Sequence, residues 1–191
     1  IEEDREGAMR RLVTDWHASY KREPDSLILA STRLETTLLN RMCQAVRLEA
    51  DELSKTAIEA GGEKIYVGDR VVFTRNQPAL LVRNGTLGVV SAIDQEKNEV
   101  LVRLDDGLQV RIQLDVFDAF ELGYALNVHR AQGATVQTAF VLAGGAMTDR
   151  ELSYVQSSRA RGQTMIYTDP VSGGPDIEAL AAQMNRSRPK D

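Results

Sequence analysis

The first sixty residues alternate between helical and strand-like hydrophobic patterns. The apolar positions that recur at helical spacing near the start are Met9, Leu12, Val13, Trp16 and Tyr20. They predict an amphipathic helix. The apolar run of residues 26–31 predicts a buried strand of a parallel sheet. Thr32 and Glu35 form a capping box that opens a helix continuing to about Leu53. A strand followed directly by a helix is the repeating unit of α/β folds.

From Lys64 to about Leu114 the pattern changes to short strands separated by turn signals. Residues 100–104 and 110–112 alternate apolar and polar side chains around Asp106-Gly107, which predicts a β-hairpin. Gly68-Asp69 and Asn84-Gly85 mark two further turns in the same stretch. So many short strands in a small segment predict a compact β-barrel of SH3-like or OB-like size.

An α/β pattern returns after Phe117. The elements that it predicts are a helix over 121–132, a strand over 139–143, a capping box at 148–151 with a helix to about Arg161, a strand over 165–169 and a helix over 176–184. Residues 1–60 and 118–185 are therefore expected to form one α/β domain. The barrel, at residues 61–117, interrupts this domain, and residues 186–191 form a basic tail.

Composition narrows the class of protein. The chain has 191 residues, of which 42% are hydrophobic and 27% charged, and it has no apolar stretch long enough to cross a bilayer. Cys43 is the only cysteine and the two histidines lie far apart, so we expect no disulfide, no metal site and a cytoplasmic protein without a membrane partner. The net charge of −5 argues against a simple DNA-coating protein. Ile1 stands inside a predicted helix, which indicates a piece of a longer protein.

A polar segment ends the predicted helix over 121–132. Its residues are His129, Arg130, Gln132, Gly133 and Thr135. Glycine lets a backbone approach a ligand closely, and a threonine hydroxyl can donate a hydrogen bond to a phosphate. Taken singly, each residue is better explained by a capped helix end. As a contiguous set before a strand, they indicate a binding segment.

Arginines stand near the ends of two other predicted elements. Arg159 and Arg161 precede the final predicted strand, and Arg33 lies in the first turn of the helix after residues 26–31. A guanidinium group donates two parallel hydrogen bonds to a phosphate and stays charged. The competing explanation is a surface arginine, since a positive charge suits the end of a helix and an arginine in a first turn is common.

These segments together resemble conserved motifs of superfamily 1 DNA helicases, in the RecD-like branch that includes conjugative relaxases of the TraA, TrwC and TraI type. The fourth, fifth and sixth motifs are similar to residues 31–33, 129–133 and 158–161. Arg130 stands where the family has lysine, and Asn127 where threonine is common. The resemblance covers residues 26–169 and implies a second RecA-like motor domain, an α/β fold whose parallel sheet has flanking helices and which carries an inserted small SH3-like β-barrel.

The resemblance also implies roles for individual residues. Arg159 would act as an arginine finger on the γ-phosphate of ATP, which can be worth ~10³-fold or more in rate. Arg33 would reach the same phosphate, and Gly133 would join the DNA-binding segment to the nucleotide cleft. The residues implied to contact single-stranded DNA are His129, Arg130, Gln132, Thr135, Arg75, Asn76 and Arg83.

No Gly-x-x-x-x-Gly-Lys-[Ser/Thr] loop occurs in the sequence, so no loop of that kind can cradle phosphates. The resemblance implies that a missing N-terminal RecA-like domain holds ATP and Mg²⁺, that a relaxase domain belongs to the same polypeptide, and that ATP drives 5′-to-3′ translocation. The chain alone is expected to bind neither cofactor and to be inactive. Two alternatives remain: a fragment of a RecD-like repair helicase, and a non-enzymatic binding module built on the barrel.

Overall fold

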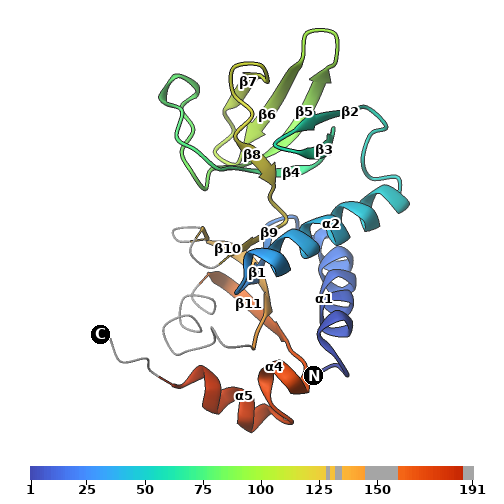
Figure 1. Cartoon of the computed structure of the whole chain (residues 1–191), viewed down its shortest axis with the longest axis vertical. Coiled ribbons are helices and arrows are strands. Elements are labelled where there is room, and N and C mark those ends of the chain that lie inside the picture. The colour runs from blue at the N-terminus through green and yellow to red at the C-terminus, as the bar shows by residue number, and fades with distance from the viewer. Residues whose placement is uncertain (128–129, 132–134, 145–158, 187–191) are drawn as a thin grey trace. The chain divides into compact units, whose positions relative to one another are not determined.

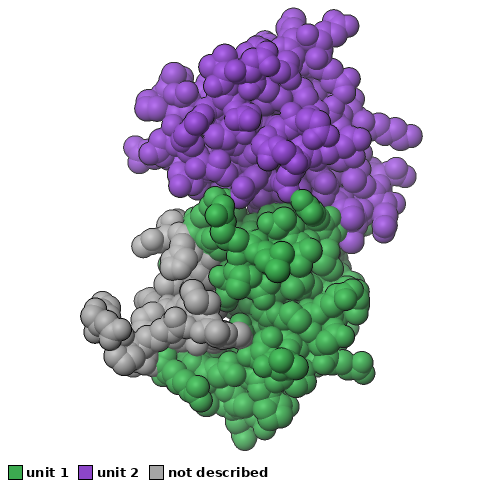
Figure 2. All heavy atoms as spheres, viewed as in Figure 1, with its two compact units in different colours: residues 1–43, 125–191 green, residues 44–124 purple. Residues whose placement is uncertain are grey.

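The computed structural model describes residues 1–127, 130–131, 135–144 and 159–186. The chain forms two compact units: unit 1 comprises residues 1–43 and 125–191, and unit 2 comprises residues 44–124 (Figure 2). His129, Gln132, Gly133, the predicted capping box at 148–151 and residues 187–191 of the predicted tail lie outside the described residues. None of the described helices is both long and apolar enough to span a membrane.

Unit 1 contains a four-stranded parallel sheet with helices around it (Figure 1). In the order in which they lie in the sheet, the strands are β11 (Ala160–Tyr167), β10 (Val136–Leu142), β1 (Ser26–Ala30) and β9 (Ala125–Asn127). Among the described residues, the helices are α1 (Arg5–Tyr20), α2 (Arg33–Glu49), α4 (Pro170–Gly173) and α5 (Ile177–Met184), and the boundary between the units falls within α2. The predicted α/β fold with a parallel sheet and flanking helices is confirmed.

Strand β1 lies at the centre of the hydrophobic core of unit 1. All five of its residues are buried, and Ile28 pairs with Phe140 of β10 on one side and Ala125 of β9 on the other. An apolar run without alternation is typical of a strand that is covered on both faces. Helix α1 packs against this sheet and buries the predicted apolar positions from Met9 to Trp16.

The side chain of Asn40, on α2, hydrogen-bonds to the edge strand β9. Its Nδ2 donates to the carbonyl oxygen of Ala125 at 3.0 Å, and its Oδ1 accepts from the amide nitrogen of Ala125 at 2.8 Å. Asn40 is buried, so both groups of its amide are satisfied where water has little access.

The predicted helix over residues 121–132 is wrong over its first part. Phe120–Leu122 forms strand β8 in unit 2, and Ala125–Asn127 forms β9 in unit 1. A short apolar run can form either a helix or a strand, and here pairing with β4 and β1 decides. Between the two strands, a Cβ atom on Gly123 would lie 2.7 Å from the Val71 backbone, so this close approach requires glycine.

The end of the next predicted helix is also wrong. Arg161 lies inside strand β11, which begins at Ala160 rather than at the predicted residue 165. β11 pairs with β10 at Ala160, opposite Val136, and after a register shift again from Gln163, opposite Thr138, to Tyr167, opposite Leu142. This pairing therefore outweighs the helical pattern at its start.

Unit 2 is an antiparallel β-structure inserted between the two parts of unit 1. Its strands are β2 (Ala57–Ala60), β3 (Glu63–Tyr66), β4 (Arg70–Phe73), β5 (Leu87–Asp94), β6 (Glu99–Leu104), β7 (Gln109–Gln113) and β8 (Phe120–Leu122), with a short 3₁₀ helix η1 at Pro78–Leu80. One sheet has the order β7-β6-β5-β4-β8, and β2 and β3 form a separate hairpin. The predicted hairpin around Asp106-Gly107 joins β6 to β7. All residues from 44 to 124 are described, and these strands do not close into the predicted barrel.

A buried polar cluster connects the start and the end of unit 2. The Tyr124 hydroxyl donates to Asp69 at 2.6 Å and accepts from Arg47 at 2.9 Å. The other carboxylate oxygen of Asp69 accepts from Gln44 and from the amide nitrogen of Tyr66. Burial raises the pKa of Asp69, and it raises the pKa of Tyr124 well above its usual range. The cluster joins α2 to the last residue of the insertion in a region that excludes water.

Replacing Tyr124 with phenylalanine should therefore destabilise the chain by about 1–3 kcal/mol, because a buried carboxylate loses a donor and Arg47 loses an acceptor. Urea unfolding measures the change. Tyr66→Phe is the matched control, since the Tyr66 hydroxyl makes no hydrogen bond within the described part of the chain. Equal midpoints for the two variants would contradict a stabilising role of the cluster.

Candidate functional site

The strand order of unit 1 points to one edge of its sheet as the candidate site. From β1 the chain continues to β9 on one side and then to β10 on the other, so the order reverses between β1 and β10. In open α/β sheets, ligands bind outside the carboxyl ends of the strands at such a switch point. Here those ends are Ala30 of β1 and Leu142 of β10, which are paired in register.

Arg33 lies at this carboxyl edge and is fixed by a capping box. The Thr32 hydroxyl accepts a hydrogen bond from the Glu35 amide nitrogen at 3.2 Å, and Glu35 Oε2 accepts from the Thr32 amide nitrogen at 3.1 Å. This confirms the predicted capping box. Arg33 is the first residue of α2, and its side chain is exposed. The carboxyl edge therefore presents the guanidinium group of Arg33, and the capping-box hydrogen bonds between Thr32 and Glu35 fix the backbone before and after it.

The neighbouring strand β9 ends at the same level and leads to Arg130. Asn127 pairs with Ala30, and its Oδ1 accepts from the amide nitrogen of Arg130 at 2.9 Å. The amide nitrogen of Ala131 donates to the backbone oxygen of Asn127. Asparagine side chains commonly accept a hydrogen bond from a backbone N–H a few residues later in the chain. Asn127, which departs from the family pattern, therefore holds the backbone of Arg130, and the structure brings Arg130 to the same edge as Arg33.

Arg159 and Thr135 form a second group at the opposite, amino edge of the sheet. The backbone oxygen of Arg159 accepts from the amide nitrogen of Val136, one residue after Thr135. Nearby, Arg161 Nη2 donates to Asp25 Oδ2 at 2.9 Å. Arg33 follows the carboxyl end of β1, whereas Arg159 precedes the amino end of β11, and the strands are parallel. The described chain therefore does not bring the two predicted ATP-contacting arginines together.

A third group lies in unit 2, on the segment that connects β4 to β5. Arg75, Asn76 and Arg83 are all exposed there. The Arg75 guanidinium lies 5.2 Å from the centre of the Phe117 ring, and Asn76 Oδ1 accepts from the amide nitrogen of Asn84 at 2.8 Å. Acidic residues outnumber basic ones in unit 2 as a whole, but residues 74–86 contain none. The segment is thus a local cationic region in an acidic unit.

One arginine at the carboxyl edge was not predicted as a site residue. Arg5 donates from Nε and Nη2 to Glu35 Oε1, at 2.9 and 2.5 Å. Its Nη1 donates to the backbone oxygen of Ala143 at 2.6 Å and to Asp169 Oδ2 at 3.4 Å. The partners of Arg5 come from segments that follow β1, β10 and β11, far apart in sequence, so no local pattern could have revealed them.

Asp169, a partner of Arg5, was predicted only as the end of the last strand. It is 1% exposed and caps α4 by accepting from the Ser172 amide nitrogen at 2.9 Å. Burial raises the pKa of Asp169, but the hydrogen bonds from Ser172 and the charge of Arg5 outweigh it and hold the pKa below its ordinary value. The carboxylate is therefore charged at neutral pH.

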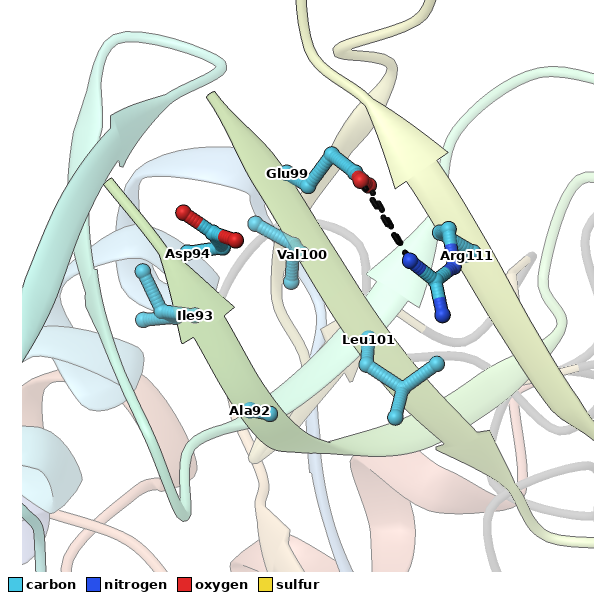
Figure 3. A pocket seen from close by; sticks show the side chains of 7 residues that line it. All are labelled: Ala92, Ile93, Asp94, Glu99, Val100, Leu101 and Arg111. Carbon is cyan, nitrogen blue, oxygen red and sulfur yellow. Dashed lines mark hydrogen bonds and ion pairs between the residues drawn. The ribbon is translucent and has the colours of Figure 1, made fainter. Parts of the chain in front are cut away.

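Unit 2 also has a shallow hollow, which lies against β5, β6 and β7 (Figure 3). The residues that line it are Ala92, Ile93, Asp94, Glu99, Val100, Leu101 and Arg111. Arg111 donates to Glu99 across its rim. None of the predicted site residues that the structure describes lines this hollow. No group of three or more His, Cys, Asp or Glu side chains suited to a metal ion occurs among the described residues.

The sequence is similar to known conjugation proteins and to a helicase. It is 33% identical to the conjugal transfer protein TraA of Agrobacterium fabrum over 84% of this chain, which amounts to 15% of that protein. It is 27% identical to the multifunctional conjugation protein TraI of Escherichia coli over 94% of this chain and 11% of that protein. The ATP-dependent RecD2 DNA helicase of Deinococcus radiodurans is 38% identical over 49% of this chain and 13% of its own length. No family model matches the sequence.

Solved helicase structures share the fold. The Pif1 helicase from Bacteroides, in complex with ADP-AlF3 and single-stranded DNA, superposes with a TM-score of 0.55 over 74% of this chain and 40% of that one, at 19% identity. The Pif1 helicase from Candida albicans gives a TM-score of 0.52 over 83% of this chain and 48% of that one, at 17% identity.

The parallel sheet, its flanking helices and these similarities define a RecA-like domain of the superfamily 1 helicase class. Within that class, the chain belongs with conjugal transfer proteins such as TraA and TraI, to part of which it is similar over most of its length. It spans about 15% of the length of the TraA relatives.

Asp169→Asn removes the charge opposite Arg5 but keeps a side chain that can cap α4. At pH 7 we expect a loss of about 1–2 kcal/mol in the free energy of unfolding. Because the folded pKa of Asp169 is lowered, its contribution is complete above the unfolded pKa of about 3.9 and is lost as the pH falls through the folded pKa.

The difference between wild type and Asp169→Asn should therefore shrink below about pH 4. Urea unfolding at several pH values measures it, with Glu96→Gln as a control on an exposed carboxylate. A difference that stays constant down to pH 2 would show that the charge of Asp169 does not stabilise the fold.

Proposed function

We propose that this chain is the second motor domain of an ATP-dependent 5′-to-3′ DNA helicase, within a cytoplasmic relaxase that transfers DNA during conjugation. The observation that carries the proposal is a parallel-sheet unit that presents arginines at both edges, in a sequence without a phosphate-cradling loop. Such a domain completes a nucleotide site rather than forming one. The relatives named TraA and TraI support the relaxase assignment.

ATP and Mg²⁺ are assigned to the first motor domain of the same polypeptide. The carboxylates of Glu35 and Asp169, at the carboxyl edge of this sheet, both accept hydrogen bonds from Arg5. They are therefore engaged by a guanidinium group, and a magnesium ion would have to displace it. What this edge offers to a nucleotide is the exposed guanidinium of Arg33, and Gly133 of the fifth motif is assigned to the same cleft.

Two arginines are candidates for the phosphate contact, on different grounds. The motif around Arg159 supports it as the arginine finger, and the position of Arg33 at the carboxyl edge supports it as a second contact. The described chain places them at opposite edges, so we assign each a role to be tested separately.

In the complete protein, Arg159→Ala should lower DNA-stimulated ATP hydrolysis by ~10³-fold while leaving the affinity for single-stranded DNA unchanged, because a finger stabilises only charge that develops on the transferred phosphate. Arg33→Ala should lower the same rate. Arg186→Ala, an exposed arginine outside the sheet, is the control. Full ATPase in both Arg159→Ala and Arg33→Ala would contradict a motor-domain role.

Single-stranded DNA is the proposed substrate of both units. His129, Arg130, Gln132 and Thr135 are assigned to DNA in unit 1. In unit 2, which we propose corresponds to the SH3-like subdomain of the RecD-like family, Arg75, Asn76 and Arg83 are assigned to the sugar-phosphate backbone. The absence of acidic residues from 74–86 supports this assignment, because attraction to phosphates depends on local charge when the net charge is negative.

Replacing both Arg75 and Arg83 with glutamine should weaken binding of the complete protein to single-stranded DNA and reduce the slope of log K against log salt by about 1.4, at ~0.7 per phosphate contact. Fluorescence anisotropy with a labelled oligonucleotide over a salt series measures both. The matched control replaces Arg103 and Arg111, which lie on the exposed face of β6 and β7. An unchanged slope would remove this segment from the DNA interface.

A RecD-like repair helicase without a relaxase domain is a second candidate, favoured by the similarity to RecD2. The gene sequence upstream distinguishes them: a phosphate-binding loop preceded by a histidine cluster and tyrosines indicates a relaxase-helicase, and the loop alone indicates a repair helicase. The third candidate, a binding module, predicts that Arg159→Ala has no effect on any activity of the parent protein.

A further inference from the structure

We propose that Arg5 is a positioning residue for Arg33: its guanidinium holds the first turn of α2 at the switch point of the sheet so that Arg33 faces the nucleotide. The proposal rests on the ATP-contacting role assigned to Arg33 above. Arg5 does not itself contact the nucleotide in this proposal. It acts through Glu35, two residues after Arg33.

The two oxygens of Glu35 link Arg5 to the backbone that carries Arg33. Oε1 accepts from Nε and Nη2 of Arg5, at 2.9 and 2.5 Å. Oε2 accepts from both the amide nitrogen and the hydroxyl of Thr32, at 3.1 and 2.9 Å. Arg33 stands between Thr32 and Glu35, so a shift of the Glu35 carboxylate moves the backbone on either side of it. A capping box by itself uses only one carboxylate oxygen of Glu35, so the bonds from Arg5 to Oε1 are an additional restraint.

The same guanidinium group also fixes the position of α2 relative to the sheet. Its Nη1 donates to the backbone oxygen of Ala143, which follows β10, and to Asp169, which follows β11. Arg5 thus bonds to segments that follow three neighbouring strands, β1, β10 and β11, all at the carboxyl edge. A planar guanidinium is suited to this because its donors have a fixed geometry, whereas the single ammonium of lysine does not reproduce it.

The contacts of Arg5 with Glu35 and Asp169 are largely buried, which favours a single geometry. The side chains of Arg5, Glu35 and Asp169 are 21%, 14% and 1% exposed. Exposed ion pairs, such as that between Arg10 and Glu6 on the same α1, contribute little to stability. Charge-assisted hydrogen bonds with limited exposure to water have a better-defined geometry. The difference between Arg5 and Arg10 provides a matched pair of substitutions on one helix.

The test uses the complete protein with Arg5→Met, Glu35→Gln and Arg33→Ala, and with Arg10→Met as the control. Steady-state ATP hydrolysis at saturating single-stranded DNA gives kcat and KM, anisotropy gives DNA affinity, and thermal melting confirms folding. Arg5→Met should lower kcat by about 10- to 100-fold, with KM and DNA affinity nearly unchanged, because a small misplacement of a catalytic group mainly affects the transition state. Glu35→Gln, which keeps an oxygen to accept from Thr32, should lower kcat in the same way.

The double variant Arg5→Met/Arg33→Ala separates positioning from general stabilisation. If Arg5 acts through Arg33, the double variant has the kcat of Arg33→Ala alone; independent effects that multiply would overturn the proposal. A normal kcat in Arg5→Met, with a reduced kcat in Arg33→Ala, would also overturn it while leaving the motor-domain function intact. A normal kcat in Arg33→Ala would show that Arg33 does not contribute to catalysis, and this would also overturn the proposal for Arg5. The Arg159→Ala variant then shows separately whether the motor-domain function stands.

Discussion

The fold of unit 1 depends on the pairing of β1 with strands that come about a hundred residues later in the chain. β1 ends at Ala30, whereas its neighbours β9 and β10 begin at Ala125 and Val136. Because unit 2 lies between them in the sequence, β9 and β10 cannot pair with β1 until unit 2 has been synthesised and its two ends have come together. Closing so long a loop costs entropy before the contacts of the sheet repay it. The buried apolar residues of β1, from Leu27 to Ala30, make this pairing favourable.

The buried cluster around Tyr124 helps to bring the two ends of unit 2 together, because it holds the last residue of unit 2 close to the first ones. Tyr124 is the last residue of unit 2, and its partners Arg47 and Asp69 come from α2 and from the turn before β4. Hydrogen bonds among buried polar groups are satisfied only in one geometry. The cluster therefore specifies where the chain leaves unit 2, and Gly123 permits the tight backbone approach that precedes it.

The local features of the chain could be predicted from the sequence, and the long-range ones could not. The first amphipathic helix, the buried strand that begins at Ser26 and the capping box of Thr32 and Glu35 depend on neighbouring residues, and the structure confirms them. Residues 120–127 were misassigned because their apolar run fits a helix until β4 and β1 are available to pair with it. The barrel was predicted from turn signals, which indicate hairpins but carry no information about whether a sheet closes. Motif similarity indicated Arg33 and Arg159 as candidate site residues but not the edges of the parallel sheet on which they lie. Arg5 could not be predicted, because its partners are distant in the sequence.

The amide of Asn40 has a consequence for how this domain meets other chains. An edge strand offers unpaired backbone groups to which a strand from another molecule can add. On β9, the outward-facing nitrogen and oxygen of Ala125 are already bonded to Asn40, which reproduces the pairing of a neighbouring strand with a single side chain. Asn40 thus shields one border of the sheet from intermolecular β-pairing and aggregation. An aspartate there would place an acceptor opposite the Ala125 oxygen and expose that border, which gives a physical reason for an amide rather than an acid at this position.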